Sequence, residues 1–245
     1  MKGPFDKSAR LSSRLVVLSG LDGSGKSTQT ALLAERLRAA GIPATEVWNR
    51  WKPTVSAVFI RLAKRYLKAR ETLKEGDYRG FTEAKRREMK SGWRRSLWQL
   101  LVWSEYAAQV RARLFMRRAT GTAVLCDRYV YDTLIDVAVN FSVAPENLKD
   151  LMDHRLLSLF PKPAVVIFID IDPETGAARK SDGTPAAYLA DRRGYYTSLA
   201  QALEAPIIDG SLPIESVAES IWDLTSEWRG SRSAAPRGGK RGTIA

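Results

Sequence analysis

The chain contains, from Leu15 to Thr28, the sequence LVVLSGLDGSGKST. From Gly20 onward this stretch fits G-x-x-x-x-G-K-[ST], the pattern of a phosphate-binding loop. The apolar run before the loop predicts a β-strand, and residues 26–40 after it have the spacing of an α-helix. Strand, glycine loop and helix in this order form the context that the pattern requires. We therefore predict an α/β protein that holds a phosphorylated ligand at this loop.

The chemistry of the loop assigns roles to its side chains. Glycine turns and the helix N-terminus direct backbone N–H groups toward a bound phosphate. Lys26 is expected to reach the β- and γ-phosphates of a nucleotide, and the hydroxyl of Ser27 to bind Mg²⁺. The predicted nucleotide-binding residues are Gly20, Asp22, Gly23, Ser24, Gly25, Lys26, Ser27 and Thr28.

Length and composition limit the class of protein. A chain of 245 residues suits one large α/β domain. No apolar run approaches the about 18 residues of a membrane span. The single cysteine, Cys126, excludes an internal disulfide and a cysteine metal cluster. Because the first residues also lack the apolar segment of a secretory signal, we expect a cytoplasmic protein without a membrane partner.

The sequence divides into three parts. Residues 1–13 form a polar lead-in, residues 14–228 one phosphate-loop domain, and residues 229–245 a basic tail that we expect to be disordered. Within the domain, apolar strands are predicted at 14–19, 44–48, 122–126, 163–170 and 206–210. The helices between them include 93–118 and 146–160, and a last helix is predicted at 214–228. This alternation predicts a parallel sheet covered on both faces, with ligands bound beyond the carboxyl ends of the strands.

Candidate catalytic residues follow these strands. Asp127 ends the third strand and is expected to hold Mg²⁺ or to orient a hydroxyl group. Arg128 beside it can bind a phosphate with two parallel hydrogen bonds. After the second strand, Arg50 is predicted to hold the phosphate of an acceptor. Trp51 either stacks on a base or sugar or belongs to the core.

A basic segment at 179–193 is predicted to act as a short lid. It contains a glycine and a proline at its centre, and arginines and a lysine surround them. Phosphoryl transfer needs charge neutralisation and the exclusion of water, which such a lid could supply. Arg179 and Arg193 are the predicted catalytic residues of this segment, with Lys180 and Arg192 as further candidates.

The order of these motifs resembles that of the thymidylate kinase family of P-loop nucleoside-monophosphate kinases. Asp127-Arg128-Tyr129 resembles the DR[YH] motif of the family, and FIDIDPE at 168–174 resembles the strand before its lid. Arg193 with Tyr196 is similar to the pattern that follows the lid. The resemblance covers residues 14–228.

This resemblance implies a five-stranded parallel sheet with helices on both faces and a short lid. It also implies transfer from ATP to dTMP with Mg²⁺, giving ADP and dTDP, in a homodimer. Arg50 and Arg128 would hold the acceptor phosphate. Tyr106 belongs to a helix similar to the one that lines the nucleoside pocket of the family, and Gln109 replaces the arginine that contacts the base.

Several positions depart from the family pattern. The segment from Arg50 to Pro53 replaces R-E-P-G-G, and Ser19 stands where a glutamate is common. The phosphate loop carries no arginine, so Arg179, Lys180 or Arg192 would have to supply that charge. Most departures lie on the acceptor side. A kinase of the same fold acting on another nucleotide, a nucleoside or a sugar is therefore the alternative.

A third interpretation follows from the net charge of +12. A basic surface and tail could make this a phosphate-loop ATPase that binds nucleic acid. The sequence disfavours this interpretation because it contains no recognised nucleic-acid-binding module. Asp127-Arg128 and the lid segment instead suit transfer to a small acceptor, so we expect no nucleic-acid partner.

Overall fold

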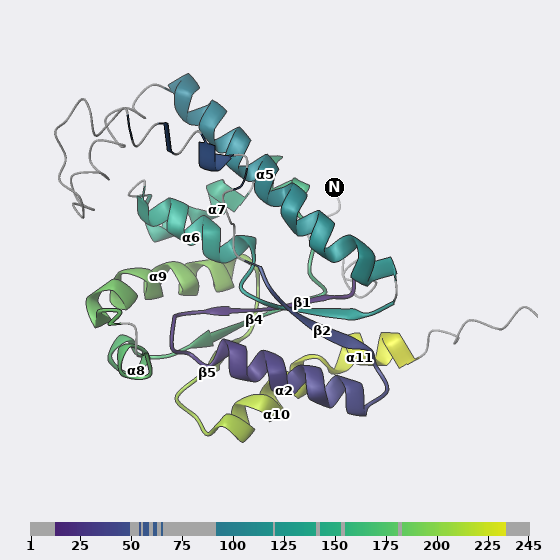
Figure 1. Ribbon diagram of the computed structural model, residues 1–245. Helices are drawn as coiled ribbons and strands as arrows, with labels where there is room; N and C mark the ends of the chain where they lie inside the picture. Colours follow the sequence, from purple (N-terminus) through teal and green to yellow (C-terminus); the bar gives the residue numbers. More distant parts are fainter. Residues whose placement is uncertain are drawn as a thin grey trace, which may run out of the picture.

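The computed structural model describes residues 13–49, 54, 56–58, 61–62, 65, 92–119, 121–140, 143–152, 155–180 and 183–233. Within them the chain forms one five-stranded sheet between two layers of helices (Figure 1). Its strands are β1 (Leu15–Gly20), β2 (Ala44–Trp48), β3 (Ala123–Asp127), β4 (Val165–Asp170) and β5 (Ile207–Asp209). They pair in the order β2-β3-β1-β4-β5, and every pair is parallel. This confirms the predicted fold class.

The helices lie on both faces of the sheet. One face is covered by α5 (Gly92–Ala119), α6 (Val130–Asn140) and α9 (Ala186–Ala202). The other face carries α2 (Lys26–Ala39), α10 (Ile214–Leu224) and α11 (Ser226–Ser233). The short helix α8 (Pro173–Ala178) follows β4. In the described part of the chain, no helix combines the length and apolar character needed to cross a bilayer.

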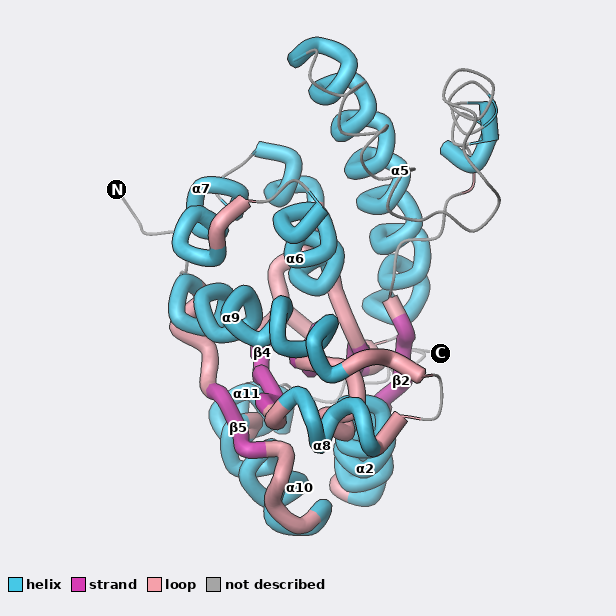
Figure 2. The backbone as a smooth tube through the Cα atoms, turned by 90° about the vertical axis from the view of Figure 1, so that its left-hand side faces the viewer, coloured by secondary structure: helices cyan, strands magenta, loops and turns pink. Residues whose placement is uncertain are grey.

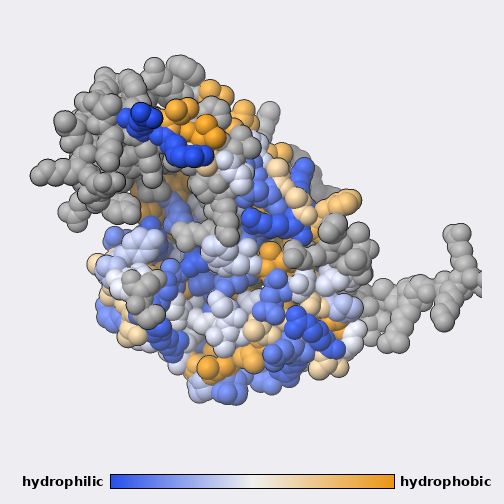
Figure 3. Space-filling model, viewed as in Figure 1, coloured by the Kyte–Doolittle hydropathy of each residue, from blue (hydrophilic) through white to orange (hydrophobic). Residues whose placement is uncertain are grey.

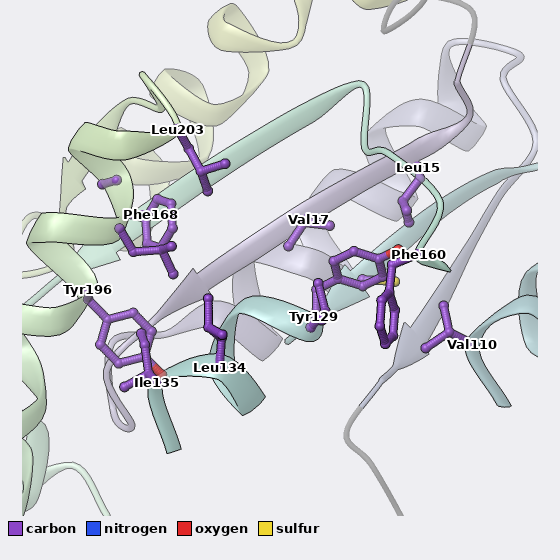
Figure 4. Close-up of a cluster of buried hydrophobic side chains, with 14 of the residues drawn as sticks. Leu15, Val17, Val110, Tyr129, Leu134, Ile135, Phe160, Phe168, Tyr196 and Leu203 are labelled. Atoms are coloured by element: carbon purple, nitrogen blue, oxygen red, sulfur yellow. The ribbon is translucent and has the colours of Figure 1, made fainter. Parts of the chain in front are cut away.

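Two hydrophobic cores result from this layering. Successive residues of β1 alternate between them, because neighbouring side chains of a strand point to opposite faces. Val17 packs with α5, α6 and α9, whereas Val16 packs with α2, α10 and α11. Figure 4 shows the first core, in which Tyr129 and Phe160 lie near Val110 of α5. Burial on both faces explains why the strands are continuously apolar.

The helix predicted at 146–160 is wrong as one continuous element. The chain instead forms η1 (Pro145–Asn147), α7 (Leu148–Met152) and η2 (Arg155–Leu159). Phe160 is buried with its ring 5.1 Å from that of Tyr106 and 5.9 Å from that of Trp103, measured between centroids. Phe160 therefore ends the segment in tertiary contacts that the local helical pattern does not indicate, and such contacts supply most of a helix's stability.

The last predicted helix, 214–228, is also divided. It breaks at Thr225 into α10 and α11, and α11 continues to Ser233, inside the segment predicted as a disordered tail. Trp228 is buried and its indole Nε1 donates to the carbonyl of Ser13 at 2.9 Å. After the break at Thr225, Trp228 of α11 thus packs against the residues that precede β1. The remaining tail and the charged segment 71–91 lie outside the described residues.

The carboxyl ends of the strands lie at one edge of the molecule, which Figure 2 shows face on. Leu18 of β1 is in register with Asp127 of β3, and Gly20 with Ile169 of β4. The start of α2 and the helix α8 meet at this edge. The sheet thus places the phosphate loop beside the segment after β3 and the segment after β4.

Candidate active site

Two glycines of the phosphate loop are required by close backbone packing. A Cβ atom at Gly20 would overlap the carbonyl oxygen of Ile169 in β4, and one at Gly23 would overlap the carbonyl oxygen of Gly176 in α8. Gly23 also has a φ of 83°, in the left-handed region that favours glycine. The loop therefore fits closely between β4 and α8, which fixes its position at the sheet edge.

Lys26 is the first residue of α2, and its side chain is buried within the loop. Its Nζ donates to the carbonyl of Leu21 and lies 3.4 Å from the hydroxyl oxygen of Ser24. Burial lowers the pKa of Lys26, while the nearby carboxylates of Asp132 and Asp127 act to raise it. An ammonium group inside the loop is suited to neutralising bound phosphate.

Ser27 and Asp127 come together across the sheet edge. The hydroxyl of Ser27 donates to Oδ2 of Asp127. The other carboxylate oxygen, Oδ1, is buried and has no hydrogen-bond partner among the described residues. Two oxygen ligands, one of them unpaired, form a donor set that suits Mg²⁺. The residues predicted to bind the metal thus fit it.

Arg128 turns toward the phosphate loop. Its backbone adopts a φ of 72°, which is uncommon for a residue other than glycine. The guanidinium donates to Oδ1 of Asp22, and Nη1 lies 3.7 Å from Oδ1 of Asp132. Nζ of Lys180 lies 3.5 Å from Oδ2 of Asp22. The loop carboxylate Asp22 therefore holds two cations from different elements at the same place.

A cavity of about 700 Å³ joins these groups. This volume lies within the range of small-molecule sites. The phosphate loop from Asp22 to Gln29 forms one wall. The remaining lining residues are Trp48, Asp127, Arg128, Arg179, Lys180, Gly210, Leu212, Ile214 and Val217. The cavity thus has a charged part at the loop and an apolar part formed by α10 and the segment before it.

The predicted lid residues separate into two groups. Arg179 and Lys180 line the cavity, and Nη1 of Arg179 donates to the carbonyl of Gly210 at 2.9 Å. Arg193 is instead paired with Asp170, with Nη2 2.6 Å from Oδ2 and Nε 3.0 Å from Oδ1. Arg192 lies 3.6 Å from Oδ1 of Asp136 and stacks over the ring of Tyr188. The structure brings Arg179 and Lys180 to the phosphate loop, whereas Arg193 pairs at the end of β4.

On the acceptor side, Tyr106 and Gln109 both contact the segment after β2. Tyr106 is fully buried, and its hydroxyl donates to the carbonyl of Asn49 at 2.7 Å. Nε2 of Gln109 lies 3.4 Å from Oγ1 of Thr54, whose backbone N–H donates to Glu105 at 2.8 Å. Tyr106 and Gln109 thus contact Asn49 and Thr54, the described residues on either side of the stretch 50–53. Arg50 and Trp51 themselves lie outside the described residues.

Sequence reasoning missed Asp132. This carboxylate is 4% exposed and accepts hydrogen bonds from Ser19, Tyr129 and Tyr196. The backbone N–H of Tyr129, the residue before α6, donates to Asp132, as it does to the acidic residue of a capping box, and an acidic residue in a first helical turn is the local signal that could have marked Asp132. Its contacts with Ser19 and Tyr196 join positions far apart in the sequence, and no local pattern indicates them.

Several proteins that are similar to this chain are thymidylate kinases. It is 30% identical over 231 residues to the thymidylate kinase of Thermomicrobium roseum, covering 89% of this chain and 98% of the relative. It is 27% identical over 221 residues to the thymidylate kinase of Ruegeria pomeroyi, with 85% and 92% covered. It is 29% identical over 219 residues to that of Synechococcus sp. (strain JA-3-3Ab), with 85% and 93% covered. No family model matches the chain.

Proposed function

The chain belongs to the thymidylate kinase family, and from this premise we propose that it transfers the γ-phosphoryl group of ATP to dTMP, giving ADP and dTDP. The observation that carries the proposal is the cavity in which the phosphate loop, Asp127, Arg128 and Lys180 converge. A kinase that phosphorylates a nucleoside monophosphate must hold two phosphorylated substrates and neutralise the charge between them. We further propose that it acts in the cytoplasm.

Lys26 and the first turn of α2 would hold the phosphates of ATP. The residue before the helix is Gly25, which provides no side-chain cap, and no acidic residue lies in the first turn. Backbone N–H groups and the positive end of the helix dipole are therefore free of a competing carboxylate within this turn. The apolar part of the cavity, at Leu212, Ile214 and Val217, offers a surface for the base.

Arg128 would hold the phosphate of the acceptor, as the sequence predicts. Its guanidinium points to the phosphate loop and lines the same cavity as Lys26. A planar guanidinium can bind two oxygens of one phosphate group. Placing donor and acceptor phosphates between Arg128 and Lys26 would orient them for direct, in-line transfer without a covalent enzyme intermediate.

Lys180 is our candidate for the cation that neutralises the transferred phosphoryl group. The phosphate loop has no arginine, so the charge must come from another element. Lys180 lines the cavity and lies 3.5 Å from Asp22 of the loop. Arg179 lines the cavity too, but one of its nitrogens is bound to Gly210. Arg192 and Arg193 pair with carboxylates of α6 and β4.

Ser27 and Asp127 would hold Mg²⁺. When bound, the ion would screen the negative charge of the phosphates. Asp127 is half-buried, and its Oδ1 atom is buried and has no hydrogen-bond partner in the described structure. Its contact with Ser27 keeps both oxygens at the same end of the cavity.

We also propose that the protein is a homodimer, and that α5 forms the interface. Leu97, Leu100 and Phe115 are 58%, 51% and 74% exposed. Leu97 and Phe115 are about five helical turns apart, so they lie on the same side of α5. Figure 3 shows apolar surface along the top of the molecule, where α5 runs. Large apolar side chains exposed along one side of a helix favour association.

The acceptor is tested by measuring ADP release with Mg-ATP and a set of acceptors. The set is dTMP, dUMP, UMP, CMP, GMP, AMP, thymidine and no acceptor. We expect dTMP to stimulate release most, and Lys26→Ala to abolish it while Lys149→Ala, on the exposed side of α7, does not. If another acceptor stimulates ADP release more strongly than dTMP does, that acceptor replaces dTMP in the proposal. Release that no acceptor stimulates would contradict the kinase assignment.

A further inference from the structure

Asp132 occupies a central position behind the cavity. It lies in the first turn of α6, is 4% exposed, and is not among the described residues that line the cavity. A buried carboxylate is costly unless several donors satisfy it. Asp132 accepts three hydrogen bonds, and each comes from a different part of the site.

The first donor comes from the strand that leads into the phosphate loop. Ser19 is fully buried in β1, one position before Gly20, and its hydroxyl lies 3.2 Å from Oδ2 of Asp132. Asp132 is also the nearby carboxylate with the largest electrostatic effect on Lys26, where it raises the pKa against the effect of burial. The position and the charge of the loop therefore both depend on α6.

The second donor lies next to Arg128. The backbone N–H of Tyr129 donates to Oδ2 of Asp132 at 3.0 Å. Arg128 itself has a φ of 72°, a conformation that is strained for a residue with a side chain. Its own N–H donates to the carbonyl of Leu18 at 3.2 Å. Strained residues persist only where surrounding contacts fix them, and Asp132 provides one of the two flanking contacts.

The third donor comes from the helix after the lid. The hydroxyl of Tyr196 in α9 lies 2.9 Å from Oδ1 of Asp132. Burial raises the pKa of Tyr196 well above its usual value, so this hydroxyl remains protonated and donates. Nη1 of Arg128 lies 3.7 Å from the same Oδ1. One carboxylate thus faces β1, the start of α6 and α9.

We propose that Asp132 is a positioning residue for phosphoryl transfer, whose buried carboxylate fixes Arg128 against the phosphate loop and joins both to α9. This inference rests on the proposed kinase function. Arg128 and Lys26 face one cavity because the elements that carry them share this carboxylate. Loss of the shared acceptor would let Arg128 move relative to the loop without removing any group that contacts substrate.

The test uses Asp132→Asn, which keeps the size of the side chain but leaves only one oxygen. Asparagine can therefore not accept from both Tyr129 and Tyr196. We expect kcat with dTMP to fall between about 10-fold and 100-fold, the effect of a small misplacement of a catalytic group. The Kd of ATP, measured by calorimetry, should rise by a clearly smaller factor than kcat falls, because the loop N–H groups are untouched. Tyr196→Phe should reduce kcat in the same direction.

A second readout does not depend on turnover. The amide of Tyr129 should exchange its hydrogen at least about tenfold faster in Asp132→Ala, which has no side-chain acceptor, whereas asparagine can keep this bond through its remaining oxygen. Asp136→Asn is the matched control, one turn later on α6 and paired with Arg192. It should leave kcat and this exchange rate unchanged.

Two results would overturn the inference. One is a kcat of Asp132→Asn within about twofold of the unaltered protein together with unchanged exchange at Tyr129 in Asp132→Ala. The other is a loss of ATP affinity by as large a factor as the loss of kcat, together with a lower melting temperature. This combination indicates a general loosening of the fold. If the unaltered protein shows no turnover with dTMP, the proposed acceptor fails. The exchange and ATP-binding measurements then still decide the role of Asp132.

Discussion

At the scale of single residues, Asp22 connects the cations of the site. It belongs to the phosphate loop and pairs with Arg128 after β3 and with Lys180 after α8. Both cations line the cavity with Lys26. Because opposite charges hold Arg128 and Lys180 beside the loop, a phosphate group bound there would lie close to both cations.

Lys180→Ala tests the cation that we assign to the transferred phosphoryl group. We expect kcat to fall about 100-fold, the typical cost of removing one group that stabilises charge in the transition state. Lys180→Arg, which keeps the charge, should retain part of the activity. Arg192→Ala is the control because Arg192 pairs with Asp136. Steady-state kinetics showing the larger loss in Arg192→Ala would exclude Lys180 from this role.

Asp127→Asn tests the metal site. The substitution removes the negative charge of Asp127 and replaces one of its two carboxylate oxygens, which are the possible metal ligands, by an amide nitrogen. The Mg²⁺ concentration for half-maximal activity should therefore rise about tenfold or more. The measurement is a Mg²⁺ titration of ADP release after removal of metal with a chelator. Asp223→Asn, on the exposed side of α10, should leave the titration unchanged. An unaltered midpoint in Asp127→Asn would remove Asp127 from the metal site.

At the scale of elements, the phosphate loop depends on its neighbours as much as on its own pattern. Gly23 contacts the backbone of Gly176 in α8, and Gly20 contacts Ile169 in β4. The start of α2 is therefore held by the strand and helix that follow it by about 150 positions in the sequence. This packing joins the phosphate loop to α8 and to the segment that follows α8.

Gly23→Ala should damage both the fold and nucleotide binding. Its Cβ would overlap a backbone carbonyl, and its φ of 83° is strained for alanine. We expect a loss of about 1–3 kcal/mol in the free energy of unfolding and weak ATP binding. Gly194→Ala, inside α9 with its nearest neighbour at 3.9 Å, should stabilise the protein by about 0.5–1 kcal/mol. Thermal unfolding with and without ATP compares the two, and equal stability of both variants would refute the packing argument.

Local patterns predicted the elements well where the pattern and the packing agree. The loop pattern and the apolar strands predicted β1, α2 and the parallel sheet, because both faces of the sheet are buried. The helix predicted at 146–160 is divided into η1, α7 and η2, and the residue that follows η2, Phe160, packs against Trp103 and Tyr106 from a distant part of the sequence. Ser19 looked like a departure from the family pattern, and the carboxylate that it contacts lies 113 positions away in α6. Periodicity within one element cannot reveal such a pair.

At the scale of the whole molecule, α5 spans the top of the first core and leaves apolar side chains on its outer side. The inner side packs Trp103, Tyr106 and Val110 against the sheet. A helix that is apolar on two sides has one side available for a partner. The homodimer predicted from the family resemblance assigns that side to a second copy.

Sedimentation of the purified protein tests this assembly. We expect a mass of about two chains, and Leu100→Glu should shift the protein toward monomer because a charge in an apolar interface lacks a partner. Glu219→Ala on α10, on the opposite face of the sheet, serves as the control. A dimer that withstands Leu100→Glu would place the interface elsewhere.

The central claim concerns the product, so the most direct measurement follows both nucleotides during one reaction. The purified protein is mixed with Mg-ATP and dTMP, and ADP and dTDP are quantified by chromatography over time, beside a reaction without dTMP. Our account predicts that ADP and dTDP appear in equal amounts, and that Lys26→Ala forms neither. ADP formed without dTDP, at the same rate with and without dTMP, would contradict it.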